Sequence, residues 1–278
     1  MAVTKFQADV LKRIADSRIK SGETYVAGGL ALNYQLKAPR LSHDIDVFNN
    51  STEALHAAYG CDSRALCEAG FDVIEKRKAP YFVEVSVVGP HGEKTDIQWV
   101  SDSAYRFFPL LEDELLGLTL HPFDLATNKL LALMGREVPR DWVDTITCHE
   151  RLQPLPYLAW AACGKDLGFS PAFILDMAMR VRYVQEELDK AVESEEPLDA
   201  AALSRKWHEM IIAARETIRL LPAEEVGKAV LTKDGELFRG TDAELRSALA
   251  AGDIVFHEGH LGGAWPRIVE RQRGETSC

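Results

Sequence analysis

Several common signatures of cross-linking and ligand binding are missing from this 278-residue sequence. It has no CxxC pair, no GxxxxGK[ST] phosphate loop and no GxGxxG dinucleotide fingerprint. No apolar run approaches the length of a membrane span, and the N-terminus is predicted to be an amphipathic helix without an apolar signal core. We therefore expect a cytoplasmic protein with no membrane partner, and scattered reduced thiols at Cys61, Cys67, Cys148, Cys163 and Cys278.

Basic residues are in the minority. The chain has 32 Lys and Arg against 43 Asp and Glu, which gives a net charge of -11 and a pI near 5.3. This balance argues against the broad basic surface that binds duplex DNA, although a local basic pocket stays open. A hydrophobic content of 46% and a charged content of 27% are typical of a soluble globular protein, with length for one large domain or two ordinary ones.

The most informative stretch covers residues 25–48. Gly28 and Gly29 follow a short apolar run and precede a helix-like segment. Glycines at such a turn let the backbone approach a phosphate, and a helix N-terminus favours negative charge. Asp44 and Asp46 follow, two apart in an expected strand that ends at Asp46, so their side chains share one face. Two converging carboxylates repel each other unless a hard cation such as Mg²⁺ lies between them.

Arg40 and Ser42 add a cationic donor and a hydroxyl just before this carboxylate pair. Each feature alone has a plainer explanation. A glycine pair after a strand is often only a turn, and an Asp-x-Asp strand end is about as often solvated as metal-binding. The combination of all these features within about twenty residues is what favours a site for a nucleoside triphosphate and its magnesium.

From residue 71 the pattern becomes β-like, with three runs at 71–76, 81–88 and 94–100 separated by turn sequences. Two short helices are expected before them, at 52–59 and 63–69. These elements predict a mixed sheet of four or five strands carrying helices, an α/β or α+β fold. Asp96 lies in the third run. It either faces solvent or supplies a third carboxylate beside Asp44 and Asp46, as in two-metal phosphoryl transfer.

A second cluster lies in residues 121–152. Lys129 is expected within an amphipathic helix, and Pro139 opens another helix that bears Arg140, Asp141 and Asp144. Acids in a first helical turn are ordinary, and Lys129 could equally be a surface lysine. In the functional interpretation, Lys129 contacts a triphosphate, and Asp144 holds that lysine or supports the metal.

Beyond residue 150 the sequence is largely helical to Leu221, and the acidic stretch 185–200 is expected to be a solvated helix end and loop. A hairpin with Asp234-Gly235 at its turn, a capped helix and a strand are predicted to follow. Two further features receive structural interpretations, because neither has the spacing of a binding motif. His257 and His260 are predicted to lie where the strand at 253–259 passes into a loop. Residues 76–78 are predicted to form a charged turn, with contact to RNA as the alternative.

The quoted residues resemble the AbiEii/AbiGii nucleotidyltransferase family, whose members include the toxins of type IV toxin-antitoxin and phage-exclusion systems. The resemblance covers residues 25–150, about half the chain. It implies a DNA-polymerase-β-like nucleotidyltransferase core, which we place at residues 1–150, followed by a mostly helical region at 151–278 with a small β element. Its residues are Gly28 and Gly29, the RxSxDxD of Arg40, Ser42, Asp44 and Asp46, the helix with Lys129, and the RDxxD of Arg140, Asp141 and Asp144.

The resemblance implies transfer of a nucleoside monophosphate from an NTP to an acceptor hydroxyl, with the tRNA 3' end as one acceptor and a cognate antitoxin encoded nearby. Asp44 and Asp46 would bind Mg²⁺, with Asp96 as a third ligand, and Lys129 and Asp144 would complete the catalytic set. Gly28, Gly29, Arg40, Ser42 and Lys129 would bind the nucleotide. Many members of the wider superfamily have serine where Gly29 stands, so one phosphate-binding hydroxyl is missing here and Ser42 becomes a more important candidate. Two alternatives stay open: transfer to a small molecule or a protein, and a catalytically silent interaction module with the same fold.

Overall fold

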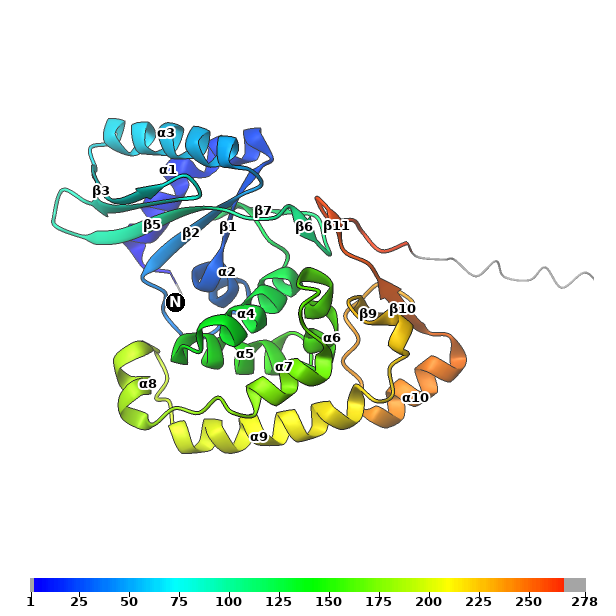
Figure 1. Ribbon diagram of the computed structural model, residues 1–278. Coiled ribbons are helices and arrows are strands. Elements are labelled where there is room, and N and C mark those ends of the chain that lie inside the picture. Colours follow the sequence, from blue (N-terminus) through cyan, green and yellow to red (C-terminus); the bar gives the residue numbers. More distant parts are fainter. Residues whose placement is uncertain (1–2, 268–278) are drawn as a thin grey trace, which may run out of the picture.

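The computed structural model describes residues 3–267, and a seven-stranded mixed sheet forms its centre (Figure 1). The strand order is β3-β4-β5-β2-β1-β8-β7. β2 is parallel to β5 and β1 to β8, while the other neighbouring pairs are antiparallel. The predicted mixed α/β fold class is confirmed. The strands are β1 (Thr24–Ala27), β2 (Asp44–Asn49), β3 (Asp72–Ala79), β4 (Phe82–Val88), β5 (Lys94–Ser101), β7 (Leu111–Asp113) and β8 (Gly117–Thr119).

The sheet is wider than predicted because β7 and β8 are too short to show a strand pattern in the sequence. The strand with the two acids also differs from the prediction. It does not end at Asp46 but begins at Asp44 and continues to Asn49, since Ile45 and Val47 are fully buried and β5 pairs with every residue of the strand. The acids therefore stand at the start of β2, next to the end of β1.

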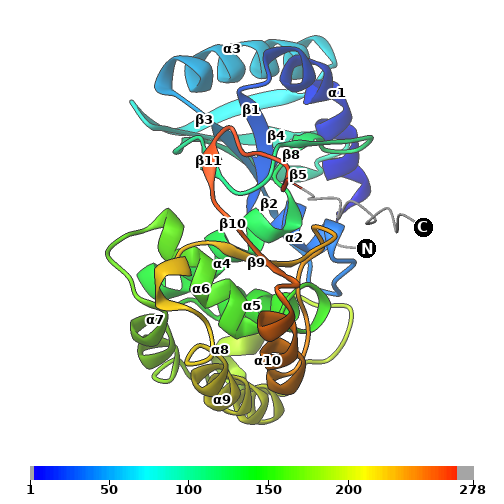
Figure 2. The same ribbon diagram turned by 90° about the vertical axis from the view of Figure 1, so that its right-hand side faces the viewer.

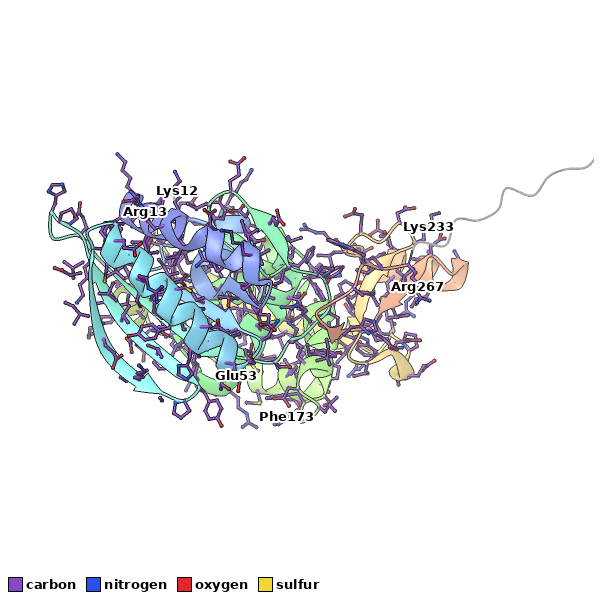
Figure 3. All side chains as sticks on the ribbon, turned by 90° about the horizontal axis from the view of Figure 1, so that it is seen from above. Lys12, Arg13, Glu53, Phe173, Lys233 and Arg267 are labelled. Atoms are coloured by element: carbon purple, nitrogen blue, oxygen red, sulfur yellow. The ribbon has the colours of Figure 1, made fainter. Side chains whose placement is uncertain are left out.

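Helices cover both faces of the sheet (Figure 1). α1 and α3 lie on one face, and α2 and α4 lie on the other, where the remaining helices follow. Lys12, Arg13 and Glu53 project outward from α1 and α3 (Figure 3), as expected for the solvent face of amphipathic helices. The helices are α1 (Lys5–Ser21), α2 (Gly28–Gln35), α3 (Thr52–Glu68), α4 (Pro122–Arg136), α5 (Pro139–Arg151), α6 (Leu155–Lys165), α7 (Pro171–Ala178), α8 (Gln185–Ala191), α9 (Ala200–Thr217) and α10 (Asp242–Ala251).

The prediction of two short helices before β3 was wrong, because α3 is continuous across Gly60. A glycine inside a helix costs about 1 kcal/mol relative to alanine. Burial of Leu55 on one side of Gly60 and of Leu66 on the other offsets that cost, since each side chain is fully enclosed.

The C-terminal region runs from α10 through β10 (Ile254–His257) to β11 (His260–Leu261) (Figure 2) and forms two small sheets apart from the central one. β9 (Ala229–Thr232) pairs with β10, and β11 pairs with β6 (Tyr105–Arg106). The turn at Asp234-Gly235 is present, but its returning arm forms only a bridge at Leu237 and is not the hairpin strand predicted. β10 supplies that strand instead, after the intervening helix α10.

One apolar core runs from α1 and the sheet through α4 and α5 into α6 and α9. The domain boundary predicted near residue 150 stays a prediction. Among the helices within residues 3–267, none is both long and apolar enough to cross a membrane. Four cysteines have free thiols, as predicted, while Cys278 lies outside the described residues; the four are Cys61, Cys67, Cys148 and Cys163.

The helix that carries Lys129 has a titratable cap. The backbone N–H of Phe123 donates to Nδ1 of His121 at 3.2 Å, and the imidazole stacks on Phe108 with 4.2 Å between ring centroids. Burial lowers the pKa of His121 to about 4, although Asp124 acts in the opposite direction. Protonation of Nδ1 would remove the acceptor that begins α4.

We predict that this histidine makes the protein less stable as the pH falls from about 6.5 to 4. In that window the unfolded chain binds a proton that the folded chain does not, so the free energy of unfolding drops by up to about 1.4 kcal/mol per pH unit. His121→Asn keeps an acceptor oxygen and cannot titrate. Urea unfolding at pH 7.5 and pH 5 should show that wild type loses about 1 to 2 kcal/mol more than this variant. Equal losses in the two proteins would contradict the prediction.

Candidate active site

The two acids of β2 share one face of the strand, and Asp46 lies over the N-terminus of α2. Asp44 and Asp46 are partly exposed on the face opposite the buried Ile45 and Val47. Gly28 begins α2 with φ at +68°, and a Cβ added there would lie 1.7 Å from Oδ2 of Asp46. Only glycine therefore allows the carboxylate of Asp46 to approach the helix start so closely. Position 28 therefore requires glycine for two reasons: the backbone has a positive φ, and a side chain there would overlap with Asp46.

The second glycine makes room for Arg40. A Cβ on Gly29 would lie 2.3 Å from Nη2 of Arg40 and 3.4 Å from Oγ of Ser42. The guanidinium of Arg40 donates to both carboxylate oxygens of Asp144, through Nε at 2.6 Å and Nη2 at 2.9 Å, and its Nη1 donates to the carbonyl of Leu41. The predicted nucleotide-binding residues Gly28, Gly29, Arg40 and Ser42 thus lie together, but Arg40 is held by Asp144.

A buried ionic cluster joins α2, α4 and α5. The Lys129 ammonium lies 2.9 Å from Oδ1 of Asp141 and 3.2 Å from Oδ2 of Asp144, and both acids are fully buried. Burial opposes the charge on Lys129, but the two carboxylates outweigh it and raise the pKa of the ammonium. Lys129 is therefore a buried cation, in contrast to the surface lysine that the sequence left open. Asn33 completes the cluster by donating to Asp144 at 3.0 Å.

Asp96 stands directly beside Asp44, its register partner in the parallel pairing of β2 with β5. Its carboxylate, however, is held by two donors, one from β3 and one from β4. Oδ2 lies 2.5 Å from the Lys76 ammonium, and Oδ1 accepts a hydrogen bond from the Ser86 hydroxyl. Burial works against ionisation, but these donors lower the pKa of Asp96. Within residues 3–267, no three His, Cys, Asp or Glu side chains lie close enough together to hold a metal ion.

The donor chemistry at the start of β2 fits a divalent hard cation. Burial and the neighbouring Asp44 raise the pKa of Asp46, while Lys129, Arg136 and Arg140 act against that shift. A carboxylate that is costly to ionise beside a second carboxylate gains most from a bound cation. The two acids that would hold Mg²⁺ are thus Asp44 and Asp46, with Asp96 available only if its contact with Lys76 opens.

A pocket of about 300 Å³ opens between Asp46, Gly28 and α4, where Lys129 and Arg136 line it. Phe48 and Asn128 line this pocket and also a second one of about 330 Å³. The second pocket continues to Tyr105. The two pockets therefore adjoin. Larger hollows of about 620 to 720 Å³ lie elsewhere, and Asp44, Asp46 and Lys129 line none of them.

Several residues that contribute to the site were given no role from the sequence. Asp141 was named as part of the RDxxD motif but given no role of its own, yet it binds Lys129 and also the Arg136 guanidinium at 2.6 Å. Its spacing of three from Asp144 was the available signal, because residues three apart share a helix face. The acidic stretch 185–200 is not only solvated, since residues 193–195 pair with residues 39–41 and form a bridge from Ser194 to Arg40.

Two interpretations of charged residues also need correction. Residues 76–78 lie within β3 rather than in a turn, because the strand continues to Ala79. His257 lies in β10, within the predicted strand, while His260 lies in β11 rather than in a loop. Nε2 of His257 is 2.8 Å from the carbonyl oxygen of Phe107 and 2.9 Å from that of Ala264, so this imidazole joins the C-terminal segment to the end of β6.

Comparison with known proteins gives one family. The family model described as "Nucleotidyl transferase AbiEii toxin, Type IV TA system" matches residues 9–228. Among solved structures, the chain is similar to MenT4, a nucleotidyltransferase toxin from Mycobacterium tuberculosis H37Rv, with a TM-score of 0.55 and 12% identity over 79% of this chain and 85% of that one. A putative nucleotidyltransferase from H. pylori gives a TM-score of 0.52 and 14% identity over 78% and 96% of the two chains. At these identities the similarity shows the fold, and no curated protein matches.

The close approach at Gly28 gives a stability test. We expect Gly28→Ala to destabilise the protein by about 2 to 3 kcal/mol, because the new Cβ is strained at positive φ and displaces Asp46. Gly135→Ala is the matched control, since Gly135 lines the same pocket and a Cβ there meets open space. That variant should gain up to about 1 kcal/mol of helix stability. Urea unfolding measures both, and similar values for the two would count against the geometry.

Proposed function

Because this chain belongs to the AbiEii nucleotidyltransferase toxin family of type IV toxin-antitoxin systems, we propose that it transfers a nucleoside monophosphate from a magnesium-bound NTP to the 3' end of a tRNA. One observation carries the proposal. Asp44 and Asp46 share one face of β2, and Asp46 lies directly against the glycine start of α2. Lys129 lines the pocket beside them. This arrangement offers carboxylates for a cation and amide and ammonium groups for phosphates.

In the proposed complex the triphosphate lies in the pocket of Gly28, Asp46 and Lys129. The N-terminus of α2 faces the phosphates, and Lys129, kept charged by its two acids, neutralises the leaving pyrophosphate. The N–H groups of Arg40 donate to Asp144 within the protein. The proposed role of Arg40 is therefore to hold Asp144 in place, and Asp144 in turn holds Lys129. Ser42 stays a proposed phosphate ligand at the entrance of α2.

Asp44 and Asp46 would hold Mg²⁺, which supplies charge neutralisation at the α-phosphate and lowers the pKa of the acceptor hydroxyl. The acceptor oxygen then forms a bond to the α-phosphorus as the bond to the bridging oxygen breaks and pyrophosphate leaves. The hydroxyl proton passes to solvent or to Asp96. Most of the catalysis would come from positioning and charge neutralisation rather than covalent chemistry.

The nucleoside would occupy the adjoining pocket. Phe48 and Asn128 line both pockets, so a nucleotide with its triphosphate at Lys129 has its sugar near these side chains and its base toward Tyr105. Aromatic faces of this kind stack on any base, and Asn128 offers hydrogen bonds to a base edge. Together the two pockets, rather than either alone, have the volume for a nucleotide.

A local basic rim supports an RNA acceptor in spite of the acidic composition. The guanidinium groups of Arg136 and Arg140 are about half exposed, at 51% and 46%, and Lys94 is exposed at the start of β5. Arg140 lies 3.8 Å from Asp44, and Arg136 lines the same pocket as Asp46. Phosphates of an RNA end would meet positive charge there. Membership in a toxin family also supports a cytoplasmic role beside a cognate antitoxin encoded nearby.

Neutralising either acid of β2 should abolish transfer. Asp44→Asn and Asp46→Asn are each expected to lower label transfer from an α-labelled NTP by at least about 100-fold, because the cation loses a charged ligand. Asp72→Asn, an exposed acid at the start of β3, serves as control and should transfer at the wild-type rate. Circular dichroism would check that all three variants are folded. Transfer retained in either site variant would reject the assignment.

The acceptor can be identified directly. We expect label from an α-labelled NTP to appear in tRNA, at its 3' end, when purified protein is incubated with total RNA and MgCl₂. Periodate oxidation of the tRNA 3' end beforehand should remove the signal. Parallel incubations with small-molecule fractions and with protein alone test the other acceptors. Label in either of those, and none in RNA, would move the proposal to a small-molecule or protein substrate. Binding of Mg-NTP without any transfer would favour a silent module.

A further inference from the structure

A β-bulge in β3 points a lysine at the candidate third carboxylate. Glu75 pairs with Val85 and Arg77 pairs with Glu84, the next residue back along β4, so Lys76 has no partner of its own in the ladder. An extra residue of this kind bends the strand and re-aims side chains. The Glu75 side chain accepts a hydrogen bond from Tyr59 of α3 on one face of the sheet. The Lys76 side chain reaches Asp96 on the other face.

The contacts of Lys76 are those of a counter-ion. Its ammonium lies 2.5 Å from Oδ2 of Asp96 and 3.8 Å from Oε1 of Glu84, while the Ser86 hydroxyl holds the other oxygen of Asp96. The Lys76 and Asp96 side chains are 35% and 24% exposed, so the pair borders the site without being sealed in. Asp96 is also the register partner of Asp44. A divalent ion that bridged Asp44 and Asp96 would therefore have to displace the ammonium.

We infer that Lys76 is a built-in cation that competes with the divalent metal for Asp96, and so sets how much free metal is needed to fill the site. The inference rests on the proposed metal site at Asp44 and Asp46. In the absence of nucleotide, Lys76 neutralises Asp96 and leaves the metal two carboxylates rather than three. When a nucleotide brings its own phosphate oxygens, the ammonium can turn to a phosphate and Asp96 becomes free for the metal or for the acceptor proton.

The test measures metal binding without turnover. Mn²⁺ binding to the full chain, followed by the electron paramagnetic resonance signal of free Mn²⁺ in the absence of nucleotide, gives a Kd for each variant. We expect Lys76→Met to bind Mn²⁺ about tenfold more tightly than wild type, because a neighbouring positive charge is gone and Asp96 is released. Lys76→Gln should behave similarly and provides a second variant should the first not fold.

The controls separate this role from a general charge effect. Arg77→Met removes a charge at the same bulge, but Arg77 contacts Glu84 rather than Asp96, so its Kd should change less than twofold. Asp96→Asn added to Lys76→Met should cancel the gain. If wild type binds Mn²⁺ and Lys76→Met matches Arg77→Met, or binds more weakly, the inference is wrong while the metal site stands. If neither wild type nor Lys76→Met binds Mn²⁺, the proposed metal site itself fails, and this inference with it.

Discussion

The contact between Lys129 and the two acids of α5 is the interaction on which the site depends. Four charged groups, Arg40, Lys129, Asp141 and Asp144, are buried within a few ångströms of one another. Burying charge is costly, and a buried ion pair seldom stabilises a fold more than apolar residues of the same size would. A buried charged cluster is instead expected where a binding site needs charges in fixed positions. It keeps Lys129 protonated and immobile before any ligand arrives.

The same cluster links the layers of the molecule. Arg40 precedes β2, Lys129 lies in α4, and Asp144 lies in α5, so one set of ion pairs fixes how the sheet meets the helices. The pocket at Asp46 lies at this junction. If α5 moved away, Lys129 would lose both counter-ions at once, and burial would then favour its neutral form. The geometry of the pocket and the charge state of its lysine are thus maintained by the same contacts.

The sequence predicted the parts of the site that depend on local rules. Alternation along β2 gave the shared face of Asp44 and Asp46, and the glycine pair indicated a close approach, although not that Asp46 itself fills the space over Gly28. What it missed depends on pairing between distant segments. The bulge that turns Lys76 toward Asp96 exists only in the register of β3 with β4, and no local pattern encodes it. The pairing of β11 with β6 could not be predicted for the same reason, because the two strands are far apart in the sequence.

Two segments from the region after residue 150 pair with the backbone of segments that border the site. The backbone of residues 193–195 pairs with residues 39–41, next to Arg40, and the C-terminal segment pairs with β6 next to the second pocket. Close contacts fix the second pairing, because a Cβ on Gly259 would meet the Tyr105 ring at 2.4 Å and one on Gly263 would meet the Phe108 carbonyl at 2.2 Å. The C-terminal half therefore supports both the Arg40 segment and the Tyr105 segment. A change in the packing of the C-terminal half would therefore alter the site through these two backbone pairings. In the proposed complex, one pairing contacts residues beside the phosphates and the other contacts residues beside the nucleoside.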